Sequence, residues 1–126
     1  MAVIVDSSVW VDILAGQEVT DVENAMAEGS VVLPPLVVAE LLSGTNTPAD
    51  RAAIGELLQD IRLHDTPLEH WMRVGELRRM LRSQGVNVSI PDAHVAQCAL
   101  DMNAIPFSRD EIFVRIARHT SLRLAR

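Results

Sequence analysis

Short runs of valine and isoleucine alternate along this chain with longer segments whose apolar residues recur at helical spacing, and this alternation limits the possible folds more than any other feature. Apolar runs at 2–6, 31–33 and 104–107 are typical of strands buried on both faces of a parallel sheet. Strands separated by helices require right-handed crossovers. The sequence therefore predicts a three-layer α/β/α sandwich with a mainly parallel central sheet.

Proline at helix starts and glycine just past helix ends place the element boundaries. Helices are expected at 8–15, 18–28, 35–43, 49–60, 67–83, 91–102 and 111–118, with further short strands at 62–65 and 120–124. Pro106 predicts a short or irregular strand at 104–107. Residues 36–42 are apolar except at Glu40, which predicts a helix buried all round. A length of 126 residues is typical of a single domain, here 1–126.

Charge and composition exclude several function classes. All eleven basic residues are arginine, so a phosphate-binding loop of the Walker type, and aspartate sites on doubly wound sheets that require a lysine, are ruled out. The first fifty residues hold eight acidic side chains and no basic one. A net charge of −6 argues against nucleic-acid binding by a basic surface, but it leaves room for a cation-bridged site flanked by local arginines.

Location and redox chemistry follow from the same composition. No apolar run approaches membrane-spanning length, and the N-terminus lacks a signal-like pattern, so we expect a cytoplasmic protein that does not contact membranes. The single Cys98 excludes an internal disulfide and is better explained as a core or helix-surface residue than as a nucleophile.

Two aspartates follow strands that a parallel sheet would align. Asp6 ends the first apolar run and precedes a helical pattern, and Asp110 follows the strand at 104–107 at the corresponding edge. Ligands bind at this edge of open α/β sheets. Taken alone, Asp6 is better explained by an N-cap of the following helix than by ligand binding, and Ser108 is likewise better explained by a helix cap.

Two further carboxylates lie on apolar faces of helices. Glu40 interrupts the apolar segment 36–42, and Asp92 shares the face of Val95, Ala96 and Ala99. A helix-dipole contact would explain the position of Asp92 in the first turn but not its apolar face. A salt bridge would explain Glu40, yet residues 1–50 contain no arginine.

Other polar residues are better explained by a solvated surface. His94 falls on the stripe of Gln97 and Asp101 and has no histidine or cysteine partner at metal-ligand spacing, so we expect it to be solvated. Asp12 lies off the apolar face of its helix, and Glu111 fits a first-turn surface position.

Four carboxylates held close would repel one another and raise their pKa values unless a cation compensates. Oxygen ligands without cysteine or histidine select Mg²⁺ or Mn²⁺. The sequence therefore predicts a magnesium or manganese site at the sheet edge.

Four segments, taken in order, resemble the PIN-domain ribonucleases, and among them the VapC-type toxins of bacterial toxin–antitoxin pairs. The segments are VIVDSSVWVD, VVAELLSG, GVNVSIPDAHVAQCAL and FSRDEIF, and together they span almost the whole chain. The resemblance makes Asp6, Glu40, Asp92 and Asp110 an acidic metal-binding quartet. Ser108 then stands where many relatives carry threonine, and Ile112 where many carry another acid.

The resemblance also implies a function and partners. It implies a metal-dependent endoribonuclease, usually a homodimer, neutralised by a cognate VapB-like antitoxin whose tail covers the site. The apolar side chains at 36–42 and 49–61 are candidates for the dimer surface. Candidate contacts to RNA phosphates are arginines, first Arg109 and then Arg78, Arg79, Arg82 and Arg115. The alternatives are a catalytically silent binding module of the same fold and a structure-specific DNA nuclease.

Overall fold

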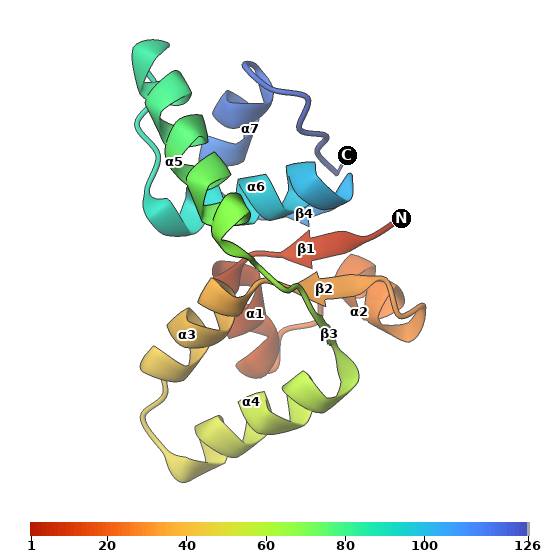
Figure 1. The fold of residues 1–126 in the computed structure, drawn as a ribbon. Coiled ribbons are helices and arrows are strands. Elements are labelled where there is room, and N and C mark those ends of the chain that lie inside the picture. Colours follow the sequence, from red (N-terminus) through yellow and green to blue (C-terminus); the bar gives the residue numbers. More distant parts are fainter. Residues whose placement is uncertain (126) are drawn as a thin grey trace.

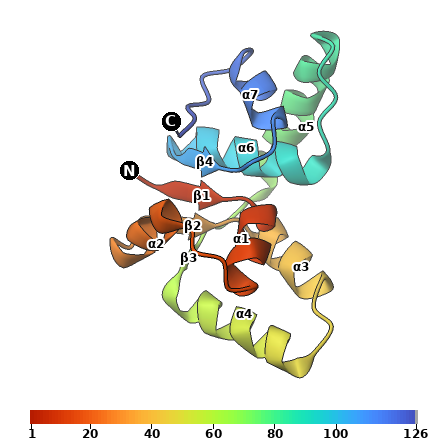
Figure 2. The same ribbon diagram turned by 180° about the vertical axis from the view of Figure 1, so that it is seen from behind.

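The computed structural model describes residues 1–125, and its centre is a four-stranded, all-parallel sheet. The strands are β1 (Val3–Val5), β2 (Val31–Leu33), β3 (Arg62–Leu63) and β4 (Ile105–Phe107), in the spatial order β3-β2-β1-β4. Helices flank this sheet (Figures 1 and 2), and the expected three-layer α/β/α sandwich is confirmed.

Seven helices occur in the described residues, and their bounds lie within a few residues of those expected from the sequence. They are α1 (Ser7–Leu14), α2 (Thr20–Ala27), α3 (Pro35–Ser43), α4 (Pro48–Asp60), α5 (Leu68–Ser83), α6 (Ile90–Met102) and α7 (Ile112–Ala117). Capping explains the agreement, because α3, α4 and α6 each have proline in the first turn. None of these helices combines the length and apolar character needed to cross a membrane.

The core lies on both sides of β1 and β2, the two central strands. Ile4, Val5 and Leu33 have no exposed surface. The helices divide into two groups (Figure 1): α5, α6 and α7 gather on the β4 side of β1, and α1, α2, α3 and α4 gather on the β2–β3 side. Helix α6 packs against β1, β4, α5 and α7, and its residues Ala93–Ala99 are all buried.

The strand expected at 120–124 is wrong, because these residues form a bend and irregular backbone. Pro106 supplies the physical reason. Its neighbours Ile105 and Phe107 direct their backbone groups towards β1, so the backbone of Pro106 faces the outer edge of the sheet. Proline has no N–H to donate there, and a fifth strand would lack a central hydrogen bond of its ladder.

The expectation that residues 36–42 form a helix buried all round is also wrong. Only Val37 and Leu41 of α3 are buried, whereas Leu42 is 42% exposed. Helix α3 packs against α1, α4 and α6 and has an open side with apolar residues. The apolar character of this segment therefore exceeds what the core of one chain requires.

Candidate functional site

Asp6 lies where β1 ends and α1 begins, and three hydrogen bonds fix its carboxylate. Oδ1 accepts from the backbone N–H of Ser7 at 2.9 Å. Oδ2 accepts from the hydroxyls of Ser8 at 3.3 Å and Ser108 at 2.9 Å. Asp6 is the N-cap of α1 and is 7% exposed. The residue therefore caps its helix and also presents an oriented, buried carboxylate at the edge of the sheet.

Ser108 connects Asp6 to Asp110. Its hydroxyl donates to Asp6, and its oxygen accepts from the backbone N–H of Asp110 at 3.0 Å. The exposed Asp110 in turn accepts from the N–H of Ile112 at 3.0 Å. Ser108 therefore holds a carboxylate and does not cap α7, whose N-cap is Glu111 without a side-chain cap bond. Glu111 is exposed, as expected.

Glu40 on α3 and Asp92 at the start of α6 are electrostatically coupled to the other acids. Burial, followed by repulsion from Asp6 and Asp92, raises the pKa of Glu40. Burial also raises the pKa of Asp92, and repulsion from Asp6 and Asp110 adds to it. A hydrogen bond to a nearby serine opposes the rise in each case. The four carboxylates thus lie close enough to disfavour one another's charge.

The donor chemistry of this cluster suits a hard divalent cation. Within residues 1–125, no arginine or histidine forms an ion pair with any of the four acids. No three of them bring oxygens within 4.8 Å of one another. Ligands of a single Mg²⁺ lie about 2.1 Å from the ion and hence within about 4.2 Å of each other. The side chains would therefore draw together around an ion, which would offset their repulsion.

Three of the candidate arginines meet at the loop that leads into α6. Arg78 donates from Nε to the backbone oxygen of Val88 at 2.8 Å. Arg115 on α7 donates to the backbone oxygen of Gly85 at 3.4 Å. Arg82 is exposed and, with Arg78 and Val88, lines a hollow of about 100 Å³. These positive charges border the segment that ends at the N-terminus of α6.

The other two candidate arginines are already paired. Arg79 binds Glu76 at 2.7 Å on the surface of α5. Arg109 forms an ion pair with Asp12 of α1. The expectation that Asp12 is merely solvated is therefore wrong, because a residue distant in sequence brings a guanidinium to it. Arg109 consequently has less free charge for a phosphate than its position in the sequence indicates.

His94 is buried with no exposed surface, so the expectation that it is solvated is wrong. Its Nδ1 lies 2.7 Å from Nε2 of His70, and Nδ1 of His70 lies 2.9 Å from Oδ2 of Asp101. Burial, with repulsion from the neighbouring histidines, lowers the pKa of His94 to about 4. Cys98 beside them is buried, as expected, and burial raises the pKa of its thiol to about 12. Sequence inspection missed this network because His70 lies on another helix.

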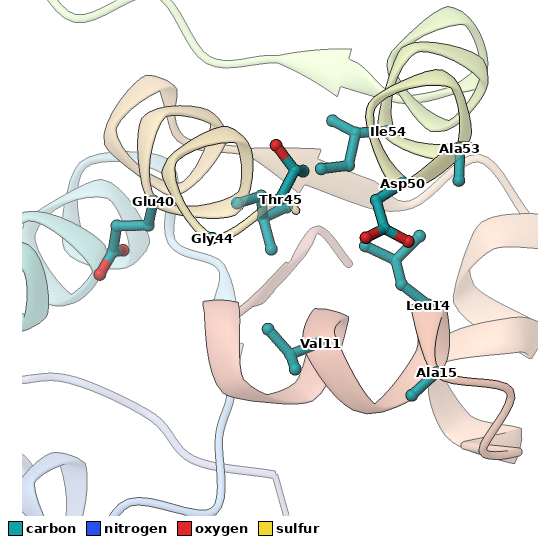
Figure 3. Close-up of a pocket in the computed structure, with 10 residues that line it drawn as sticks. Val11, Leu14, Ala15, Glu40, Gly44, Thr45, Asp50, Ala53 and Ile54 are labelled. Atoms are coloured by element: carbon teal, nitrogen blue, oxygen red, sulfur yellow. The ribbon is translucent and has the colours of Figure 1, made fainter. Parts of the chain in front are cut away.

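A groove of about 220 Å³ opens beside Glu40. Figure 3 shows its walls, formed by Val11 and Leu14 of α1, the end of α3, and Asp50 and Ile54 of α4, with Glu40 at one end. Val11 is 56% exposed. The groove thus borders Glu40, whose carboxylate points away from the other labelled residues in Figure 3. Sequence patterns do not reveal it, because its walls come from three helices.

Comparisons with known proteins agree with this fold. VapBC2 from Rickettsia felis, bound to a DNA fragment from their promoter, has a TM-score of 0.83 and 17% identity, covering 99% of this chain and 98% of that chain. DNA-bound VapBC from Salmonella typhimurium has a TM-score of 0.84 and 15% identity, and the match covers 99% of this chain and 97% of that chain. VapBC-1 from nontypeable Haemophilus influenzae has a TM-score of 0.77 and 20% identity, covering 99% and 97%. At these identities the likeness is one of fold. A search of curated proteins finds no match.

The sequence itself carries the family signal. Residues 3–119 match the family model described as PIN domain. The matched region runs from β1 through α7 and contains all four carboxylates. The chain belongs to the PIN-domain family.

Proposed function

We propose that this chain is a metal-dependent endoribonuclease of the VapC type, the toxin of a toxin–antitoxin pair. PIN domains are nuclease domains and generally use divalent metal ions. The observation that carries the proposal is the set of four carboxylates, Asp6, Glu40, Asp92 and Asp110, which repel one another without an arginine to neutralise them. Such a set is costly for a protein that does not bind a cation.

The four carboxylates would hold Mg²⁺ or Mn²⁺ through oxygen. The chemistry that the bound ion supplies is activation of a water for in-line attack and neutralisation of the phosphate. Asp6 contributes a pre-oriented ligand, because Ser108 and the start of α1 fix both of its oxygens. Asp110, which is exposed, faces solvent from which a phosphate can approach. Attack by water leaves 5′-phosphate and 3′-hydroxyl ends.

RNA is the proposed substrate, and the arginines beside α6 are the proposed phosphate contacts. Arg82 and Arg115 carry charge that no ion pair within residues 1–125 neutralises. Arg78 is held in place by the backbone of the loop before Asp92. Phosphate contacts of this kind position a strand without reading its sequence. Arg79 and Arg109, being paired, are weaker candidates.

The proposed partners are an antitoxin and a second copy of the chain. The solved structures of similar fold include VapBC complexes. The groove beside Glu40 offers apolar walls and the carboxylate of Asp50, which suits a helix or tail with apolar and basic side chains. The open apolar side of α3 near Leu42 remains the candidate dimer surface, together with the apolar residues of α4.

Nuclease assays with a matched variant test the proposal. Purified protein is incubated with RNA or with DNA, in Mn²⁺ or in EDTA, alongside Asp92→Asn and the control Asp65→Asn, an exposed acid outside the cluster. We expect RNA cleavage that requires Mn²⁺ and falls by about a hundredfold or more in Asp92→Asn, because a ligand of the catalytic ion is weakened. The control should match the unaltered protein.

Three other outcomes would contradict the proposal in distinct ways. Cleavage of DNA alone would support the structure-specific DNA nuclease. RNA cleavage that resists EDTA, or that Asp92→Asn leaves unchanged, would remove the metal mechanism. A folded protein that binds a basic antitoxin peptide yet cuts neither nucleic acid would support the silent binding module.

A further inference from the structure

Three histidines and the single cysteine meet where α5 and α6 pack together. His70 of α5 and His94 and Cys98 of α6 have no exposed surface, and half-buried His64 reaches them from the segment between β3 and α5. His94 follows Asp92 by two residues, which turns the two side chains to opposite sides of α6. The cluster is therefore separate from the four carboxylates.

We propose that His64, His70 and Cys98 form a second metal site, suited to Zn²⁺ or another cation that prefers nitrogen and sulfur. One potential ligand atom from each residue lies within 4.8 Å of the other two. Cys98 Sγ and His70 Nε2 are 3.8 Å apart. In a tetrahedral zinc site, a nitrogen and a sulfur ligand are separated by about 3.6 Å. Small side-chain movements would therefore complete the geometry.

The tautomer of His70 suits a metal ligand. Asp101 accepts a hydrogen bond from Nδ1 of His70 at 2.9 Å, which leaves the lone pair on Nε2. Nε2 faces Nδ1 of His94 at 2.7 Å and lies 3.8 Å from the sulfur of Cys98. Two other side chains hold Asp101, because Arg73 donates to both of its oxygens and Gln97 donates to one. A carboxylate that orients the distal nitrogen of a histidine is the usual outer-shell support of a zinc ligand.

The alternative role for these residues is a hydrogen-bonded core without metal. His94 Nδ1 lies 2.7 Å from His70 Nε2, and the ring of Trp71 stacks on His94 with centroids 4.5 Å apart. A cation on Nε2 of His70 would displace the N–H that His94 donates there. His94 would keep that proton, and the thiol of Cys98 would release one proton to solvent. The sulfur of Cys98 lies 3.8 Å from Nε2 of His70 and 3.8 Å from Nδ1 of His94, so it faces the ring nitrogens beside which a cation would bind. His64 provides a route to solvent for an entering ion.

Cobalt titration of the full chain tests the site directly. Protein freed of metal with EDTA is titrated with Co²⁺ in excess Mg²⁺, which occupies oxygen ligands but competes poorly for thiolate and imidazole. We expect the near-ultraviolet thiolate-to-cobalt charge-transfer band and the visible bands of tetrahedral Co²⁺, at one equivalent, with both lost when Zn²⁺ is added. A folded protein that shows neither band overturns the proposal.

Variants identify the ligands. Cys98→Ser should abolish the charge-transfer band, and His64→Gln should weaken Zn²⁺ binding at least tenfold. The control is His119→Gln, which alters the exposed histidine outside the cluster and should change neither. Circular dichroism checks the fold of each variant, and Cys98→Ala replaces Cys98→Ser should the latter unfold. Equal Zn²⁺ affinity of His64→Gln and the unaltered protein overturns the proposal. None of these readouts depends on nuclease activity.

Discussion

The Ser108 hydroxyl links two of the four carboxylates, although Ser108 lies 102 positions after Asp6 in the chain. It donates to Asp6 at 2.9 Å and accepts from the N–H of Asp110 at 3.0 Å. Both bonds orient groups that we propose as metal ligands, and neither holds core packing together. Ser108 is therefore a positioning residue whose contribution a single substitution can isolate.

Removal of this hydroxyl should weaken metal binding without unfolding the protein. We expect Ser108→Ala to lower Mn²⁺ affinity or RNA cleavage by about 10–100-fold, the usual effect of losing an outer-shell partner. Ser108→Thr keeps the hydroxyl and should restore most of the loss. Mn²⁺ titration and cleavage rates measure both effects, with Ser121→Ala at an exposed serine as control. Unchanged Mn²⁺ affinity and rate in Ser108→Ala would show that Asp6 needs no support.

Individual residues differed in how well the sequence predicted their surroundings. Asp6 and Asp110 were identifiable because the ends of parallel strands meet at one edge, a geometric consequence of the fold. The burial of His94 was not identifiable from the sequence. Neighbouring elements cover the middle of α6 on every side, so polar residues at helical spacing, such as His94 and Gln97, do not mark a solvated face. His70, the partner of His94, lies 24 residues away on another helix.

At the scale of elements, Asp101 joins α6 to α5. Arg73 and His70 on α5 donate to it, and so does Gln97 one turn earlier on α6. Burial works to raise the pKa of Asp101, but the hydrogen bonds of these donors outweigh it and lower the pKa to about 2. A carboxyl group with a lowered pKa stabilises the folded protein at pH values above its ordinary pKa of 3.8. This stabilisation is lost as the pH falls towards the folded-state pKa of about 2.

We therefore expect Asp101→Asn to destabilise the protein at pH 7 by about 1 to 2 kcal/mol, since asparagine carries no charge and has one acceptor oxygen for donors that bind both oxygens of Asp101. This difference in the free energy of unfolding should persist down to about pH 4. It should shrink between pH 4 and pH 2, where the carboxyl of Asp101 in the unaltered protein takes up a proton. Urea unfolding at several pH values measures it. Glu76→Gln breaks the exposed ion pair between Glu76 and Arg79 within α5, and it should lower the free energy of unfolding by less than about 1 kcal/mol. Equal costs for the two variants would show that the hydrogen bonds of Asp101 stabilise the protein no more than an exposed ion pair does.

The elements were largely predictable from the sequence, and the exceptions have identifiable causes. Residues 31–33 and 35–43 coincide with β2 and α3, because proline and glycine mark their limits. Residues 120–124 do not form the expected strand, because a strand beside β4 would lack the backbone hydrogen bond that Pro106 cannot donate. The sequence pattern of 120–124 alone does not reveal which strand it would pair with. The exposure of α3 depends on which helices cover it, and that is a property of the assembled fold.

On the scale of the whole molecule, charge is divided across the sheet. The segment from β1 through α3 lies within the first fifty residues, which contain no basic side chain. Most arginines belong to the later part of the chain, where α5 and α7 gather on the β4 side (Figure 2). The proposed metal centre lies between them, formed by Asp6 from one side and Asp92 from the other. We therefore expect a phosphate backbone to be attracted to one side of the proposed centre and a basic peptide to the other.

This arrangement predicts a local salt effect on RNA binding. In the Asp92→Asn background, which prevents cleavage, Arg82→Gln should weaken RNA binding and reduce the slope of log affinity against log salt by about 0.7, the value for one phosphate contact to a single strand. Arg51→Gln removes an exposed charge on α4, on the other side of the sheet, and should leave the slope unchanged. Binding curves at several salt concentrations measure both. An equal change of slope in the two variants would mean that RNA senses only the net charge of −6, and the proposed phosphate contact at Arg82 would have to be abandoned.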